Sequence, residues 1–183
     1  NELVFCRGPA GSGKTYLAVA MAVNALRTEL VRKIVLVRPA VEAGERLGFL
    51  PGDLDEKLAP WMAAVHDNLY ALFSGDPQSA KGAIEELLDR NVIEMAAVTY
   101  LRGRSITDEL VIIDEAQNLS VTAMEELRML SNLNCDKHLV LQVMLVGQPG
   151  LRDTLRRPEL AQFAQRIAVE HHLSALTASE TRQ

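Results

Sequence analysis

Residues 8–15 read Gly8-Pro9-Ala10-Gly11-Ser12-Gly13-Lys14-Thr15, and these eight residues are the strongest indication of the fold class. It matches the pattern G-x-x-x-x-G-K-[ST] in full. Its glycines let the backbone curl so that successive N–H groups point inward at a phosphate. In such a loop the Lys14 ammonium contacts the β- and γ-phosphates, and the Thr15 hydroxyl binds Mg²⁺. The stretch therefore predicts a phosphate-binding loop, or P-loop, that takes ATP with Mg²⁺.

The residues on either side of the loop provide the context that its chemistry needs. The apolar run Leu3–Cys6 predicts a strand before it, and the Ala-rich stretch from Lys14 to about Leu30 predicts a helix after it. The positive end of that helix adds to the attraction for phosphate. We expect the nucleotide to contact Gly8, Pro9, Ala10, Gly11, Ser12, Gly13, Lys14, Thr15 and Tyr16.

A second acidic motif ends another apolar run. Residues 110–115 read Leu-Val-Ile-Ile-Asp-Glu, so a buried strand delivers Asp114 and Glu115 to one edge of the sheet. We expect Asp114 and Thr15 to bind the Mg²⁺ ion, and Glu115 to act as the general base for an attacking water. A P-loop followed by this acidic pair predicts an ATPase, since a small-molecule kinase would not need the glutamate.

The order of apolar and helical segments predicts an α/β fold of the P-loop NTPase class. Strand-like runs alternate with helical ones, which is typical of a mostly parallel sheet covered by helices on both faces. We expect a three-layer sandwich with a five-stranded sheet. At least two strands lie between the P-loop and Asp114, which fits the P-loop division that has an extra strand between the two motifs.

The composition restricts the remaining function classes. The chain has 183 residues, a length that favours a single domain over 1–183. No apolar run approaches the roughly 18 residues that span a bilayer, so we expect no membrane span. A net charge of −5 argues against a surface that is basic throughout, although a local basic groove stays compatible with it.

Further polar residues are candidates for supporting roles. Gln148 ends a third apolar strand, where a γ-phosphate sensor would lie, and Gln117 is placed to orient water; the alternative for each is a solvated amide. Arginines form two groups, either of which could supply an arginine finger that stabilises transition-state charge, or could instead be solvated. The first group, a candidate for nucleic-acid contact as well, is Arg38, Arg102 and Arg104; the second is Arg152, Arg156, Arg157 and Arg166, with Arg166 as its best finger candidate.

From residue 3 to about residue 118 the sequence resembles the PhoH family of phosphate-starvation-inducible ATPases. The resemblance rests on Gly8–Ala18, Arg38–Glu45, Leu47–Asp53, Tyr100–Arg104 and Asp114–Asn118. It implies a cytoplasmic ATPase related to superfamily 1 helicases. Single-stranded RNA as a partner and a homo-oligomeric ring are further expectations that come with this resemblance.

Residues 119–183 are similar instead to the ExeA/GspA-type general-secretion AAA ATPases. The similarity rests on Leu119-Ser120, residues 125–133, Val146–Pro149, Arg157–Leu160 and Gln165–Ile167. A PhoH protein is expected to carry Gly-Asp where Gly147-Gln148 stands. We therefore predict a family junction near residues 114–118 and a domain truncated at both ends.

The sequence leaves three functions open. The first is a PhoH-type ATPase that couples hydrolysis to RNA binding or unwinding, with Lys14, Glu115, Gln148 and Arg166 as catalytic residues. The second is a secretion-type AAA ATPase that acts on a protein partner. The third is a nucleotide-binding module without turnover.

Overall fold

The computed structural model describes residues 2–39, 63, 65–73, 77–101, 108–130 and 141–175. In this part of the chain six strands form one sheet, in the order β3-β2-β4-β5-β1-β6, and every pairing is parallel. The strands are β1 (Glu2–Arg7), β2 (Lys33–Arg38), β3 (Ile93–Ala97), β4 (Glu109–Ile113), β5 (Leu141–Gly147) and β6 (Ile167–His172). The predicted α/β class is confirmed, with six strands rather than five.

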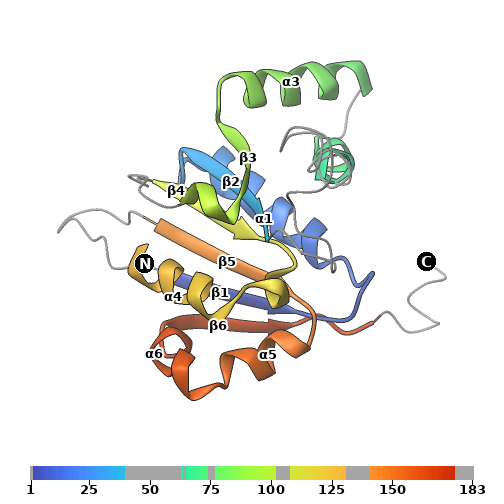
Figure 1. Cartoon of the computed structure of the whole chain (residues 1–183). Coiled ribbons are helices and arrows are strands. Elements are labelled where there is room, and N and C mark those ends of the chain that lie inside the picture. Colours follow the sequence, from blue (N-terminus) through green and yellow to red (C-terminus); the bar gives the residue numbers. More distant parts are fainter. Residues whose placement is uncertain are drawn as a thin grey trace, which may run out of the picture.

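Helices cover both faces of this sheet, as Figure 1 shows. The sheet carries α1 on one side and α4, α5 and α6 on the other, and α3 lies next to β3. The α-helices are α1 (Lys14–Arg27), one over residues 65–72, α3 (Pro77–Asp89), α4 (Val121–Leu130), α5 (Gly150–Leu155) and α6 (Ala161–Ala164). Short 3₁₀ helices follow β3 (η2, Val98–Leu101), follow β4 (η3, Ala116–Asn118) and precede α6 (η4, Pro158–Leu160).

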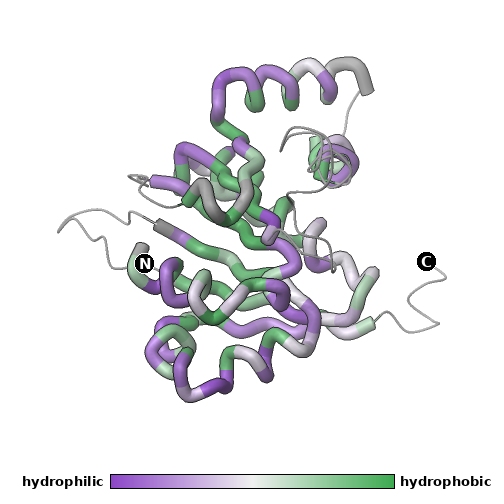
Figure 2. Tube along the Cα trace, viewed as in Figure 1, coloured by the Kyte–Doolittle hydropathy of each residue, from purple (hydrophilic) through white to green (hydrophobic). Residues whose placement is uncertain are grey.

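Alternate side chains of each central strand enter two separate cores. In β4, Val111 and Ile113 pack with α4, α5 and α6, whereas Leu110 and Ile112 pack with α1 and α3. All four are buried, as expected of a parallel strand covered on both faces. Figure 2 shows the hydrophobic colour along the strands in the middle of the molecule and more of the hydrophilic colour on outer helices such as α3 and α5. The sheet is therefore packed on both faces, and it holds the loops that follow its strands in place.

The strand order explains how distant motifs meet. The two strands predicted between the motifs in the chain are present as β2 and β3, and in the sheet β5 lies between β1 and β4. Because all the strands are parallel, the residues that follow β1, β4 and β5 emerge at the same edge of the sheet. At this edge the N–H of Gly8 donates to the carbonyl of Gly147 at 3.2 Å. The P-loop, the acidic motif and the end of β5 therefore lie together.

Several predicted segments fall outside the described residues. They include nearly all of Arg38–Glu45 and the whole of Leu47–Asp53, on which the family resemblance rests, and the arginines Arg102 and Arg104. Among the described residues near the C-terminal end, α5 ends at Leu155 and Pro158 begins η4.

Two Gly→Ala substitutions should change stability in opposite directions. A Cβ at Gly8 would lie 2.4 Å from the carbonyl oxygen of Leu173 and 2.8 Å from Ser12 Oγ, so Gly8→Ala should lower the free energy of unfolding by about 1–3 kcal/mol. Gly82, inside α3, has no atom within 4 Å of such a Cβ. Gly82→Ala should therefore raise stability by about 0.4–1 kcal/mol. Urea unfolding of the two variants checks both signs, and equal losses would contradict the expectation.

Candidate nucleotide-binding site

The P-loop has the backbone shape that the motif predicts. Gly11 and Gly13 have φ angles of 73° and 80°, in the left-handed region that side chains with a Cβ rarely adopt. Inside the loop, Ser12 Oγ donates to the carbonyl of Pro9 at 2.9 Å. The first helical N–H groups of α1 come directly after Gly13, so their free donors face the same concavity. This arrangement presents backbone N–H groups and the positive end of a helix to an anion.

The Lys14 ammonium lies inside the loop that it is predicted to serve. Its side chain is buried, and Nζ donates to the carbonyl oxygen of Pro9 at 2.7 Å. In the described part of the chain this is the one hydrogen bond that the ammonium makes, and no carboxylate lies within ion-pair distance. A buried cation without a counter-ion is costly. The loop is therefore electrostatically prepared for an anionic ligand.

Thr15 and Asp114, the two residues predicted to bind Mg²⁺, lie next to each other. Thr15 Oγ1 lies 3.1 Å from Asp114 Oδ1 and 3.2 Å from Oδ2, although the two residues are far apart in sequence. Asp114 is buried, and burial raises the pKa of its carboxyl above the ordinary value of 3.8, against the lowering effect of hydrogen bonds from Glu115 N–H and Thr15. Arg38, at the end of β2, opposes the rise by its positive charge. A bound cation would stabilise the charged form of this desolvated carboxylate.

Asp114→Asn should therefore separate stability from function. Because the folded pKa is raised, the folded state binds a proton more readily than the unfolded state. Stability of the unliganded protein is thus lost as pH rises from 3.8 through the folded pKa, and above the folded pKa the whole cost is present. We expect Asn at this position to raise the melting temperature in EDTA and to weaken the stabilisation by Mg-ATP. Thermal unfolding with Asp67→Asn as an exposed control checks this, and a lower melting temperature in EDTA would contradict it.

Glu115 is held in an unusual backbone conformation by its neighbours. Its φ of 51° lies in the left-handed region, which costs about 1–2 kcal/mol for a residue with a Cβ. Its N–H donates to Asp114 Oδ1 at 3.0 Å, and its carbonyl accepts from Asn118 N–H at 2.9 Å. Its Oε2 accepts a hydrogen bond from Gln117 Nε2, and Gln117 Oε1 in turn accepts from the backbone N–H of Gln148 at 2.9 Å. The carboxylate at the end of β4 is thereby tied to the end of β5.

The other predicted site residues are not all brought together. Gln148 lies at the P-loop edge with an exposed side chain, and Tyr16 is 43% exposed in the first turn of α1. Arg166 precedes β6, whose first residue pairs with Leu3 at the opposite end of β1 from the P-loop. Within one chain Arg166 is therefore remote from Lys14. As an arginine finger, Arg166 could therefore contact only the nucleotide of a neighbouring subunit, and this role stays a prediction.

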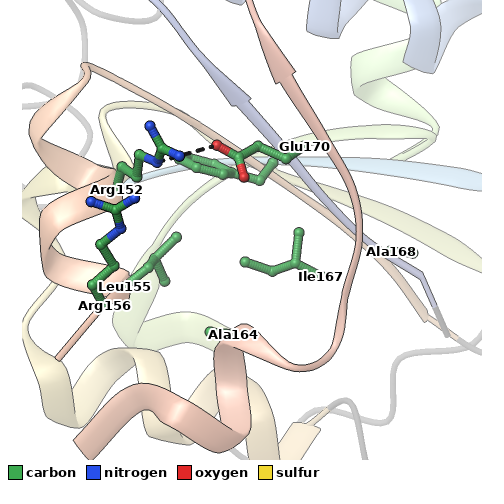
Figure 3. Close-up of a pocket in the computed structure, with 8 residues that line it drawn as sticks. Arg152, Leu155, Arg156, Ala164, Ile167, Ala168 and Glu170 are labelled. Carbon is green, nitrogen blue, oxygen red and sulfur yellow. Dashed lines mark ion pairs between the residues drawn. The ribbon is translucent and has the colours of Figure 1, made fainter. Parts of the chain in front are cut away.

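Two arginines of the second basic group, Arg152 and Arg156, line a separate cavity of about 410 Å³ between α5, α6 and β6. Figure 3 shows Arg152 directed toward Glu170, with the side chains of Leu155 and Ile167 below them. Arg152 Nε lies 3.8 Å from Glu170 Oε1, and Arg7 Nε contacts the same oxygen at 2.9 Å. Arg7, Arg152 and Glu170 therefore form one group of ion pairs that joins β1, α5 and β6.

The residues present fit Mg²⁺ and a nucleoside triphosphate. Mg²⁺ is usually held by one or two protein oxygens together with substrate phosphates and waters. The Thr15 hydroxyl and the Asp114 carboxylate supply such oxygens, and in the described part of the chain no group of three His, Cys, Asp or Glu offers a different metal site. The loop amides and Lys14 would hold the phosphates. What the sequence did not reveal is the bridge through Gln117, whose only signal was its closeness to Glu115.

A parallel sheet, a P-loop between its first strand and first helix, and a buried aspartate opposite Thr15 define a P-loop NTPase. The model of the PhoH-like protein family matches residues 1–145. The chain belongs to the PhoH family. The match confirms the resemblance seen in the sequence and extends it beyond residue 118, and the predicted junction near residues 114–118 stays a prediction.

Curated relatives carry the same family name. A PhoH-like protein of Mycobacterium leprae is 51% identical over 153 residues, which cover 82% of this chain and 41% of the relative. A PhoH-like protein of Bacillus subtilis is 50% identical over 125 residues, which cover 68% of this chain and 37% of the relative. The chain thus spans about two fifths of the length of these relatives.

Solved structures support the fold at low sequence identity. The ORC2 protein of Aeropyrum pernix in its ADP form matches 98% of this chain and 44% of its own, with a TM-score of 0.50 and 16% identity. This likeness shows the fold alone. Among the helices described in the structure, none is long and apolar enough to cross a membrane.

Proposed function

We propose that this domain is a cytoplasmic Mg²⁺-dependent ATPase that cleaves the β–γ bond of ATP. The observation that carries the proposal is the meeting of Lys14, Thr15, Asp114 and Glu115 at one edge of the sheet, with Thr15 Oγ1 3.1 Å from Asp114 Oδ1. Family membership supports the nucleotide class, since the matched region contains both motifs. The hydrolytic step is our proposal from the acidic pair.

The chemistry assigns a separate task to each side chain. The loop amides and Lys14 bind the β- and γ-phosphates, and Thr15 and Asp114 hold Mg²⁺, which when bound neutralises phosphate charge. Glu115 accepts a proton from water as the water oxygen bonds to the γ-phosphorus and the bond to the bridging oxygen breaks. The products are ADP and inorganic phosphate. Gln148, at the end of β5, is the proposed sensor of the γ-phosphate.

The proposed target is single-stranded RNA, and the proposed assembly is a homo-oligomeric ring. Arg38 supports the first part, because it is the last residue of β2, at the same edge of the sheet as the nucleotide loop, and its positive charge acts on Asp114. An arginine at this edge is placed to contact a phosphate backbone beside the site. Arg166 supports the second part. It lies at the end of the sheet away from its own P-loop, so as an arginine finger it could reach only the nucleotide of a neighbouring subunit.

Phosphate release from Mg-ATP, with and without a single-stranded RNA oligonucleotide, tests the proposal. We expect turnover that rises with RNA and loses this response in Arg38→Ala, beside Arg90→Ala as a control at an exposed surface pair. Turnover that depends on protein concentration but ignores RNA would favour a secretion-type ATPase with a protein partner. Tight ATP binding without phosphate release would establish a nucleotide-binding module and reject the ATPase.

A further inference from the structure

We infer that Gln117 is a positioning residue that aims the Glu115 carboxylate and couples its orientation to the end of β5. This inference rests on the proposed function, because it assigns Glu115 the role of base. The two ends of one side-chain amide make different contacts. Nε2 donates to Glu115 Oε2, and Oε1 accepts from Gln148 N–H at 2.9 Å. Gln117 therefore connects the segment after β4 to the end of β5, where its partner Gln148 lies 31 residues further along the chain.

The space for this bridge is built into β5. A Cβ at Gly147 would lie 2.8 Å from Gln117 Oε1 and 3.3 Å from the Gln117 backbone nitrogen. Glycine at position 147 therefore leaves room that the Gln117 amide fills. The carbonyl of the same glycine accepts the N–H of Gly8, the first residue of the P-loop. One short segment of β5 thus contacts both the phosphate loop and the residue that holds the base.

The backbone of Glu115 explains why a positioning residue is needed. Its left-handed φ of 51° is fixed by contacts of the main chain, but these leave the side chain free to rotate. A general base must lie within hydrogen-bond reach of the water that it deprotonates. The donor from Gln117 fixes one carboxylate oxygen and leaves the other for water. A shift of Gln148 would move the Gln117 amide and, through it, the carboxylate.

Two isosteric variants separate the two halves of the amide. Gln117→Met keeps the length of the side chain and removes both hydrogen bonds. Gln117→Glu keeps an acceptor for Gln148 N–H, removes the donor to Glu115 and places a second negative charge beside it. We expect both variants to lower kcat of ATP hydrolysis by about 10- to 100-fold and to leave KM for ATP within about twofold, because the phosphate loop is untouched.

The comparison distinguishes positioning from a structural role. If Gln117 only joined β4 to β5, Gln117→Glu would keep the wild-type kcat, and that result would overturn the inference. Asn118→Ala, at the exposed next residue of η3, is the matched control and should retain the wild-type kcat. In a Glu115→Gln background, Gln117→Met should cause no further loss, since a residue that acts through another gives non-additive effects. Multiplying losses would overturn the inference.

The same assay separates this inference from the proposed function. Wild-type turnover together with an unchanged kcat in both Gln117 variants would remove the positioning role and leave the ATPase standing. Absence of Mg²⁺-dependent turnover in the wild-type chain would reject the ATPase, and the positioning role with it. Gly147→Ala provides a second approach, because its Cβ would displace the Gln117 amide; we expect a loss of kcat in the same range as for Gln117→Met.

Discussion

Lys14→Ala should weaken ATP binding by at least about 100-fold and abolish measurable hydrolysis. The ammonium is buried in the loop and, within the described residues, has only the carbonyl of Pro9 as a hydrogen-bond partner, so its charge is available to phosphate. Losing one partner of a buried charge contact costs about 3 kcal/mol or more, which corresponds to a factor of about 100 in affinity. Isothermal titration with a non-hydrolysable ATP analogue measures this change.

The matched control for Lys14→Ala is Lys81→Ala. Lys81 is exposed on α3, where its pair with Glu85 is a surface contact of little value. The Lys81→Ala variant should bind the ATP analogue with the affinity of the wild-type chain. Because removing an uncompensated buried cation relieves desolvation, Lys14→Ala should not lower the melting temperature of the unliganded protein. If Lys14→Ala bound the ATP analogue with wild-type affinity, the loop would not use Lys14 to bind phosphate.

Glu115→Gln should reduce kcat by about 10²- to 10⁴-fold while ATP binding stays close to that of the wild type. The substitution keeps the size of the side chain and removes its ability to accept a proton. Glu115 lies outside the loop that holds the phosphates, so ground-state binding should change little. Phosphate release and analogue binding, measured on the same preparation, separate these two effects.

Glu159→Gln is the control for that substitution, since Glu159 is exposed in η4. Its kcat should equal that of the wild-type chain. If Glu115→Gln retained full turnover, the base would have to be another group. If it lost binding and turnover together, Glu115 would act in the ground state and not in the chemical step.

Local sequence patterns were enough to predict the P-loop and the acidic strand end. Gly11 and Gly13 adopt the left-handed backbone that the motif requires, and Asp114 lies beside Thr15 as two strand ends at one sheet edge should. In both cases the chemistry is encoded within a few consecutive residues. The apolar runs likewise located the strands, because burial on both faces gives each run an uninterrupted hydrophobic character.

Contacts that depend on strand order could not be predicted in this way. The hydrogen bond between Gln117 and Gln148 requires β4 and β5 to be neighbours, and hydrophobic periodicity carries no information on neighbours. The close approach of Leu173 to Gly8 requires β6 to lie beside β1. The sequence does not indicate which atoms lie next to Gly8 and Gly147, where a Cβ would otherwise be.

The strand order also gives the site its internal connection. Because β5 separates β1 from β4, its C-terminal end contacts the phosphate loop through Gly147 and the acidic motif through Gln148. A change at any of the three strand ends is therefore passed on through hydrogen bonds.

A single-turnover reaction, with the protein in excess over ATP, shows whether this site itself hydrolyses ATP. Under these conditions every ATP molecule is bound, so the conversion of ATP to ADP and phosphate reports the chemistry of this site without product release. We expect complete conversion in Mg²⁺ and none in EDTA. Recovery of the bound ATP intact in the presence of Mg²⁺ would contradict it and would reduce the domain to a nucleotide-binding module.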